Sequence, residues 1–123
     1  MTSVVRGFLA VEAASFYAAT LLHAGWLVAG HAHSKAATAE GVIGTVLLGG
    51  LLASLASPRS SRAAGLAAQG FALLGTCVGI LTIVIGIGPR TPVDFVLHAG
   101  FVALLVTGLA RVSRGEQRAV RHA

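Results

Sequence analysis

The stretch AAGLAAQGFALLGTCVGILTIVIGIG, residues 63–88, decides the fold class, because it contains no charged residue and exceeds the roughly 20 residues that a helix needs to cross a bilayer. Three further apolar stretches cover residues 4–30, 41–56 and 93–110. With 55% hydrophobic and 11% charged residues, the 123-residue chain has too little polar material to cover a soluble domain. We therefore predict an all-α integral membrane protein, residues 1–123 forming a single domain with four transmembrane helices in an up-down bundle.

The basic residues predict the orientation of this bundle. Seven of the nine would lie on one side of a four-span chain, and Lys35 and Arg90 on the other; the seven are Arg6, Arg59, Arg62, Arg111, Arg114, Arg118 and Arg121. Loops rich in Lys and Arg stay in the cytoplasm, so both termini are expected there, in the inner membrane of a bacterium. We attribute the net charge of +5 to this collar, with the tail 111–123 contacting anionic lipid, and expect no nucleic-acid partner.

Small residues predict how the helices pack. A ridge recurs every four residues in the second stretch, and the third stretch contains Gly75-x-x-x-Gly79; the ridge consists of Gly41, Thr45, Gly49, Ala53 and Ser57. Such spacing lets two helix backbones approach closely in a bilayer. We expect these positions to pack within the chain, against another membrane subunit or in a homo-oligomer.

A repeated word carries the most specific signal. LHAGW at residues 22–26 recurs as LHAGF at residues 97–101, so His23 and His98 each lie in an apolar stretch, where a polar side chain is costly. The first and last helices of an up-down bundle are neighbours, which places both rings at similar depth near the outer surface. Other polar residues cluster at the same end, and they are His31, His33, Lys35, Glu40, Arg90 and Asp94.

Three interpretations of the two histidines remain open. The rings of His23 and His98 would ligate a haem b, with Trp26 and Phe101 packed around it and with Lys35 and Arg90 facing its propionates. Alternatively, they would bind Cu or Zn together with Asp94 or with His31 and His33. In the third interpretation, each ring forms an interhelical hydrogen bond to a backbone carbonyl or to Asp94.

Glu12 is the other costly residue. It lies eleven residues before His23, on the same helical face, so the two side chains would form a proton path across much of the bilayer. Alternatively, Glu12 stays protonated and forms a hydrogen bond to Gln69, Thr45 or a backbone group, or meets a partner subunit.

The length, the four spans and the carboxylate in the first span are similar to those of the small multidrug resistance transporters, but the resemblance stops there. Those proteins carry aromatic residues in the second and third spans, whereas this chain has none in the second and only Phe71 in the third.

The sequence contains no Ser/His/Asp set, Walker loop, dinucleotide glycine motif or zinc-protease helix, so we do not expect it to be an enzyme. We expect an accessory or anchor subunit of a larger bacterial membrane complex, with an electron-transfer role around a haem b or quinone near the outer leaflet. The alternatives are a small proton-coupled transporter acting as a dimer and a Cu- or Zn-binding membrane protein.

Overall fold

The computed structural model describes the backbone of residues 1–121 and the side chains of residues 1–114, and this part of the chain contains helices and no strand. The elements are α1 (Thr2–His23), α2 (Ser34–Ala56), the 3-10 turn η1 (Pro58–Ser60), α3 (Ser61–Val84) and α4 (Pro92–Arg121). Four segments are long and apolar enough to cross a membrane, namely Thr2–His23, Ser34–Ala56, Pro58–Val84 and Pro92–Arg114. The prediction of an all-α fold with four helices long and apolar enough to cross a membrane is therefore confirmed for the described residues.

The predicted boundaries of the first three spans are wrong by several residues. The first helix ends at His23 instead of residue 30, the second begins at Ser34 instead of residue 41, and the third ends at Val84 instead of residue 88. Glycines in the left-handed region (Gly25, Gly30 and Gly86, with φ of +80° to +86°) occupy the connections, whose residues 26–28 and 85–87 are as apolar as the helices beside them. The apolar residues therefore continue beyond the ends of α1 and α3. The first residues of α2 are polar, so they fall outside the predicted span.

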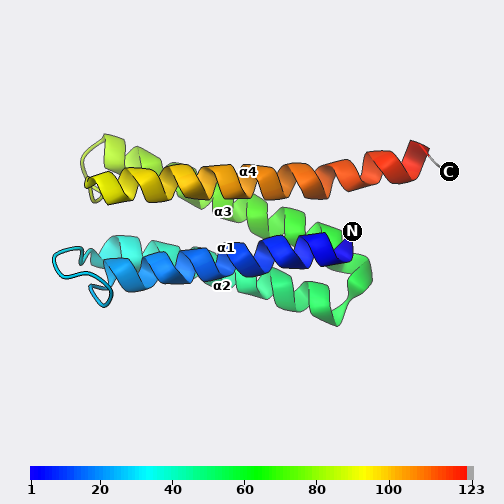
Figure 1. Cartoon of the computed structure of the whole chain (residues 1–123), viewed down its shortest axis with the longest axis horizontal. Coiled ribbons are helices and arrows are strands. Elements are labelled where there is room, and N and C mark those ends of the chain that lie inside the picture. Colours follow the sequence, from blue (N-terminus) through cyan, green and yellow to red (C-terminus); the bar gives the residue numbers. More distant parts are fainter. Residues whose placement is uncertain (122–123) are drawn as a thin grey trace.

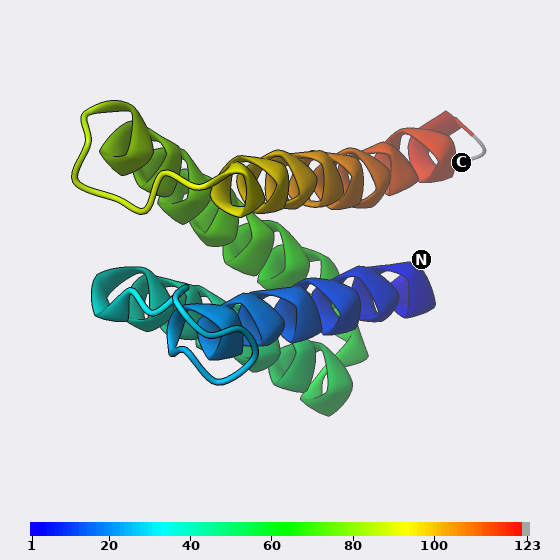
Figure 2. The ribbon, with the colours of Figure 1, turned by 60° about the vertical axis from the view of Figure 1, so that its left-hand side comes forward.

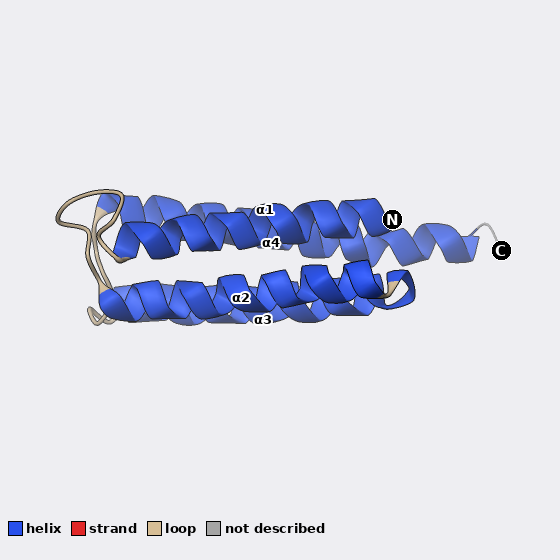
Figure 3. Ribbon diagram, turned by 90° about the horizontal axis from the view of Figure 1, so that it is seen from below, coloured by secondary structure: helices blue, strands red, loops and turns tan. Residues whose placement is uncertain are grey.

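Successive helices run in opposite directions (Figure 1). The N-terminus and the C-terminal end of α4 lie at one end, which we call the terminal end, and the connections 24–33 and 85–91 lie at the other, which we call the histidine end. Figure 3 shows α1 with α4 in one layer and α2 with α3 in a second. Helix α3 crosses obliquely, from beside α4 at the histidine end towards α2 at the terminal end (Figure 2).

The buried core follows one face of α1, because this helix packs against the other three. Phe16 of α1 stacks on Phe101 of α4, with 4.1 Å between ring centroids. The core residues are Val5, Leu9, Ala13, Phe16 and Ala19 of α1, Ile43 and Leu47 of α2, Ala68 and Ala72 of α3, and Phe101, Leu105 and Val112 of α4.

Glycines set the closest helix approaches. A Cβ on Gly75 would lie 2.8 Å from Ile43, and one on Gly79 would lie 2.9 Å from the His98 ring, so this pair sits at two contacts of α3, as its spacing suggests. A Cβ on Gly50 would meet Ala68 at 2.7 Å. At each of these positions a side chain would force a neighbouring group to shift.

Most of the small-residue ridge of α2 is exposed in this chain. Thr45, Gly49, Ala53 and Ser57 are all exposed, and a Cβ on Gly49 would meet nothing within 4 Å. Of the alternatives given for the ridge, close helix packing within the chain therefore does not hold at Gly49. The neighbouring face of α2 is used instead, because it combines bulky apolar side chains with small residues; it contains Ile43, Gly44, Leu47, Gly50 and Ser54.

Candidate functional site at the histidine end

His23 lies between two buried carboxyl groups that come from two other helices. Its Nδ1 is 2.7 Å from Glu40 Oε2, and its Nε2 is 2.8 Å from Asp94 Oδ1. The relative exposure of the three residues is 1%, 5% and 1%, respectively. His23 is the last residue of α1, Glu40 lies in the second turn of α2, and Asp94 lies in the first turn of α4. This triad ties three helices together at one depth.

Asp94 also caps the helix to which it belongs. Its Oδ2 accepts hydrogen bonds from the backbone N–H of Thr91 at 2.7 Å and from the Thr91 hydroxyl at 2.6 Å. Thr91 immediately precedes α4, so the pair resembles a capping box, with Pro92 at the favourable first helical position. One carboxylate therefore starts α4 and attaches it to α1.

His98 lies one turn beyond Asp94 and is turned towards α3. Its Nδ1 donates to the Asp94 backbone carbonyl at 2.8 Å, which fixes the proton on Nδ1 in the neutral ring. The ring packs against Gly79 and edge-on to Phe101, with centroids 6.1 Å apart.

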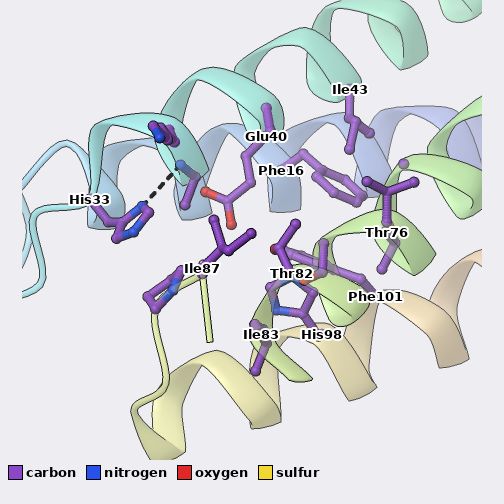
Figure 4. A pocket seen from close by; sticks show the side chains of 18 residues that line it. Phe16, His33, Glu40, Ile43, Thr76, Thr82, Ile83, Ile87, His98 and Phe101 are labelled. Carbon is purple, nitrogen blue, oxygen red and sulfur yellow. Dashed lines mark hydrogen bonds between the residues drawn. The ribbon is translucent and has the colours of Figure 1, made fainter. Parts of the chain in front are cut away.

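A cavity of about 180 Å³ opens beside the triad. Figure 4 shows that Glu40 reaches it from α2, with His98, Phe16 and Phe101 around the same space. The second Glu40 oxygen, Oε1, is buried and has no hydrogen-bond partner. The cavity is lined by Phe16, His33, Lys35, Ala36, Ala39, Glu40, Ile43, Gly75, Thr76, Val78, Gly79, Thr82, Ile83, Ile87, Gly88, Pro89, His98 and Phe101.

The structure favours the hydrogen-bonding interpretation of the histidines. His23 of α1 bonds to Asp94 of α4, which is an interhelical bond of the kind that the sequence suggests. His98 instead bonds to a backbone carbonyl of its own helix, that of Asp94. Glu40 as the second partner of His23 was missed, because the predicted span begins at residue 41 whereas α2 begins at Ser34 and includes Glu40. Because both His23 nitrogens face carboxyl oxygens, neither is free to ligate haem iron in this arrangement.

The other predicted ligands are scattered. Trp26 is 79% exposed in the connection 24–33, and Lys35 and Arg90 are exposed. His33 caps α2 by accepting from the Ala36 N–H at 3.2 Å, and His31 is half-buried. Within the part of the chain that the structure describes, no group of three or more His, Cys, Asp or Glu side chains is placed to hold a metal ion. The proposed Cu or Zn set of His23, His98, Asp94, His31 and His33 is therefore not assembled.

A second polar contact lies deeper in the bundle. Gln69 of α3 donates to Glu12 Oε1 at 3.2 Å, so Gln69 is the partner among those suggested for Glu12. Gly108 of α4 makes room, since a Cβ there would lie 2.6 Å from this oxygen. Glu12 Oε2 and Gln69 Oε1 are buried without partners. Between Glu12 and His23, the same face of α1 presents buried Phe16 and Ala19, so an apolar layer separates the two sites.

A third contact closes the terminal end. Arg6 of α1 donates to the Ser54 hydroxyl at 3.2 Å and to the Ser54 carbonyl at 2.6 Å. The Ser54 hydroxyl of α2 donates to the Ser61 hydroxyl of α3 at 2.7 Å. Polar groups thus join α1 to its neighbours at three depths.

Comparisons of this chain with protein families, with curated proteins and with solved structures find no match.

Proposed function

We propose that this chain is a small accessory or anchor subunit of a larger complex in a bacterial inner membrane. The observation that carries the proposal is the face of α2 formed by Gly41, Thr45, Gly49 and Ala53, of which all but the half-buried Gly41 are exposed. The same chain uses small residues at close helix approaches elsewhere, at Gly50, Gly75 and Gly79. An exposed face of the same composition is suited to a helix from another copy or another protein.

Polar groups on this face support a protein neighbour. The Tyr17 and Thr45 hydroxyls, 3.0 Å apart, form an exposed hydrogen bond at its edge. These residues line a shallow groove with Thr38, Gly41 and Val42. Hydroxyl groups give no advantage against lipid tails, whereas they can bond across a helix interface.

The basic residues support an up-down bundle with both termini in the cytoplasm. Arg6, Arg59 and Arg62 belong to the terminal end, as do Arg111 and Arg114 in the second half of α4. By the positive-inside rule, the terminal end faces the cytoplasm and the histidine end faces the outer leaflet. The exposed Arg111 and Arg114 are placed to contact anionic lipid; the side chains of residues 115–123, including Arg118 and Arg121, lie outside the described residues.

Three glycine variants test the subunit proposal. Gly49→Leu adds a bulky side chain where the chain itself has open space, so the bundle should fold while the complex is lost. Gly100→Leu is the matched control, because it is equally open but lies on α4. Gly50→Leu is the opposite control, because its side chain would collide with Ala68 and should prevent folding.

The measurement is the size of the tagged protein in native gels of gently solubilised host membranes. The wild type and Gly100→Leu should migrate in a complex, and Gly49→Leu should migrate as a folded monomer. A wild type that is monomeric, or a complex that survives Gly49→Leu, would refute the proposal.

The electron-transfer form of this proposal fits a quinone-type ring better than a haem. Bis-histidine ligation would require His23 to give up one of its two carboxyl contacts. The cavity beside Glu40, by contrast, needs no rearrangement to accept a small ring.

A dimeric proton-coupled transporter is the second candidate. The observation that favours it is Glu12, a fully buried carboxyl group within α1 with one oxygen unpaired. Such groups inside membrane helices commonly mark ion or proton sites.

A further inference from the structure

We propose that the cavity at the histidine end binds an aromatic ring bearing hydroxyl groups, the chemistry of a quinol headgroup, with Glu40 Oε1 and His98 Nε2 accepting its hydrogen bonds. This inference names the ligand class for the electron-transfer form of the proposed function. It does not require a partner subunit, because every residue it uses belongs to this chain.

The size of the cavity selects a single ring. Its volume of about 180 Å³ is close to that of an engineered apolar cavity of roughly 150 Å³ that binds benzene. Phe16 and Phe101 stack at one wall, and Ile43, Ile83 and Ile87 provide much of the rest. A porphyrin, with four pyrrole rings in one plane, is too large for this space.

Glu40 supplies the first polar contact. Its side chain is 7% exposed, and Oε1 has no partner within the chain. A buried oxygen without a hydrogen bond destabilises the protein, so a ligand that donates a hydrogen bond to this oxygen gains affinity. In Figure 4 the carboxyl group of Glu40 is directed from α2 towards the space beside Phe16 and Ile87.

The triad holds this oxygen in place. Glu40 Oε2 is bonded to His23, which is bonded in turn to Asp94, and Asp94 is bonded to Thr91. Because Oε2 is fixed on the His23 side, Oε1 is the oxygen left for the cavity. His23 and Asp94 are therefore positioning residues, and Glu40 is the binding residue.

His98 supplies the second polar contact. Its Nδ1 proton is used on the Asp94 carbonyl, so the neutral ring presents Nε2 as an acceptor. No hydrogen bond to Nε2 is present among the described residues, and the ring lines the cavity. Two acceptors around an apolar space call for a ligand with two donors, which a quinol has and the oxidised quinone lacks.

The positive charge of Lys35 favours a neutral hydrogen-bond donor over a cationic ligand. It lines the same cavity from the first turn of α2, as does His33. An ammonium ligand would be attracted to Glu40 but repelled by the Lys35 ammonium. A neutral hydroxyl donor is attracted to Glu40 without that repulsion.

Three matched probes test the proposal on the purified wild-type protein in lipid nanodiscs under nitrogen. The probes are hydroquinone, its dimethyl ether and benzylamine, and binding is measured by calorimetry and by ligand-observed NMR. Hydroquinone should bind about tenfold more tightly than the dimethyl ether, which has the same ring without a donor. Equal affinity for the two, binding of neither, or tighter binding of benzylamine would overturn the proposal.

Variants locate the site. Glu40→Gln should weaken hydroquinone binding by about tenfold and leave the dimethyl ether unaffected. Ser54→Ala, which removes a buried polar contact at the opposite end, is the control and should bind like the wild type. Unchanged hydroquinone binding in Glu40→Gln would contradict the assignment. Gly49→Leu should also bind normally, so failure of the subunit proposal and failure of the ligand proposal are distinguishable.

A decyl-substituted hydroquinone identifies the source of the ring. If the natural ligand is a membrane quinol, the decyl compound should bind more tightly than hydroquinone and compete with it. If the ring is taken from water, the added chain should not increase affinity. Either result supports the ring-diol class, and an absence of competition would refute a shared site.

Discussion

Removal of the Asp94 side chain tests whether the triad organises the histidine end. Asp94→Ala deletes a carboxyl group that accepts three hydrogen bonds, one from the His23 side and two from Thr91. The variant leaves a ring nitrogen of His23 buried without a partner and removes the cap at the start of α4.

The expected loss follows from these contacts. Loss of a helix cap costs about 1 kcal/mol, and a buried polar group left without a partner costs about 1–3 kcal/mol. Together they predict that Asp94→Ala lowers the free energy of unfolding by about 2–4 kcal/mol. Asp94→Asn should cost about 1 kcal/mol, because its oxygen can accept from Thr91 while its NH₂ group donates to an unprotonated His23 Nε2.

Reversible unfolding in mixed micelles, followed by circular dichroism, gives these free energies. Val93→Ala is the control in the same turn; Val93 is 40% exposed, and its truncation should change stability by less than about 0.5 kcal/mol. The argument fails if Asp94→Ala costs no more than Val93→Ala. It also fails if Asp94→Asn is as damaging as Asp94→Ala, because hydrogen bonding would then not be the stabilising interaction.

The remaining predictions concern orientation and transport. A reporter that works only in the cytoplasm should be active when it is fused to the C-terminus, because Arg6, Arg59 and Arg62 lie at the terminal end. Activity of a reporter that works only in the periplasm would instead place the histidine end at the inner leaflet. If the chain is a proton-coupled transporter, liposomes containing it should dissipate an imposed pH gradient, followed with a pH-sensitive dye inside the liposomes, and Glu12→Gln should abolish that proton flux. Proton flux that survives Glu12→Gln would refute a role of Glu12 in proton coupling.

The sequence predicts the four membrane helices because apolar runs in a bilayer leave the backbone few alternatives to a helix. It does not predict where those helices end. Residues 26–28 and 85–87 are as apolar as the spans, yet they form connections at positive-φ glycines. It also cannot choose between adjacent faces of α2, since small residues recur on both. The buried face is marked by Ile43 and Leu47, which belong to the same core as residues of α1 and α3.

The sequence predicts at which end of the bundle the candidate site lies, but it does not predict which hydrogen bonds its side chains form. The two LHAG words correctly marked the histidine end, and the link between His23 and Asp94 was among the interpretations. The two LHAG segments adopt different backbone conformations. The chain turns at Gly25, with φ +80°, but continues as a helix through Gly100. One histidine therefore ends a helix with both nitrogens bonded, and the other lies inside a helix with one nitrogen bonded.

The position of His23 at the end of α1 explains how one side chain can join three helices. A ring in the middle of a helix is flanked by side chains of the turns before and after it. The last residue of a helix has no following turn, so its ring can contact residues of two other helices. The backbone of His23 is held too, because its carbonyl accepts the N–H of His33 at 2.7 Å and so closes the connection 24–33. His33 then caps α2, which carries Glu40 back to the His23 ring. The connection and the triad thus fix each other, and the orientation of Glu40 towards the cavity follows from both.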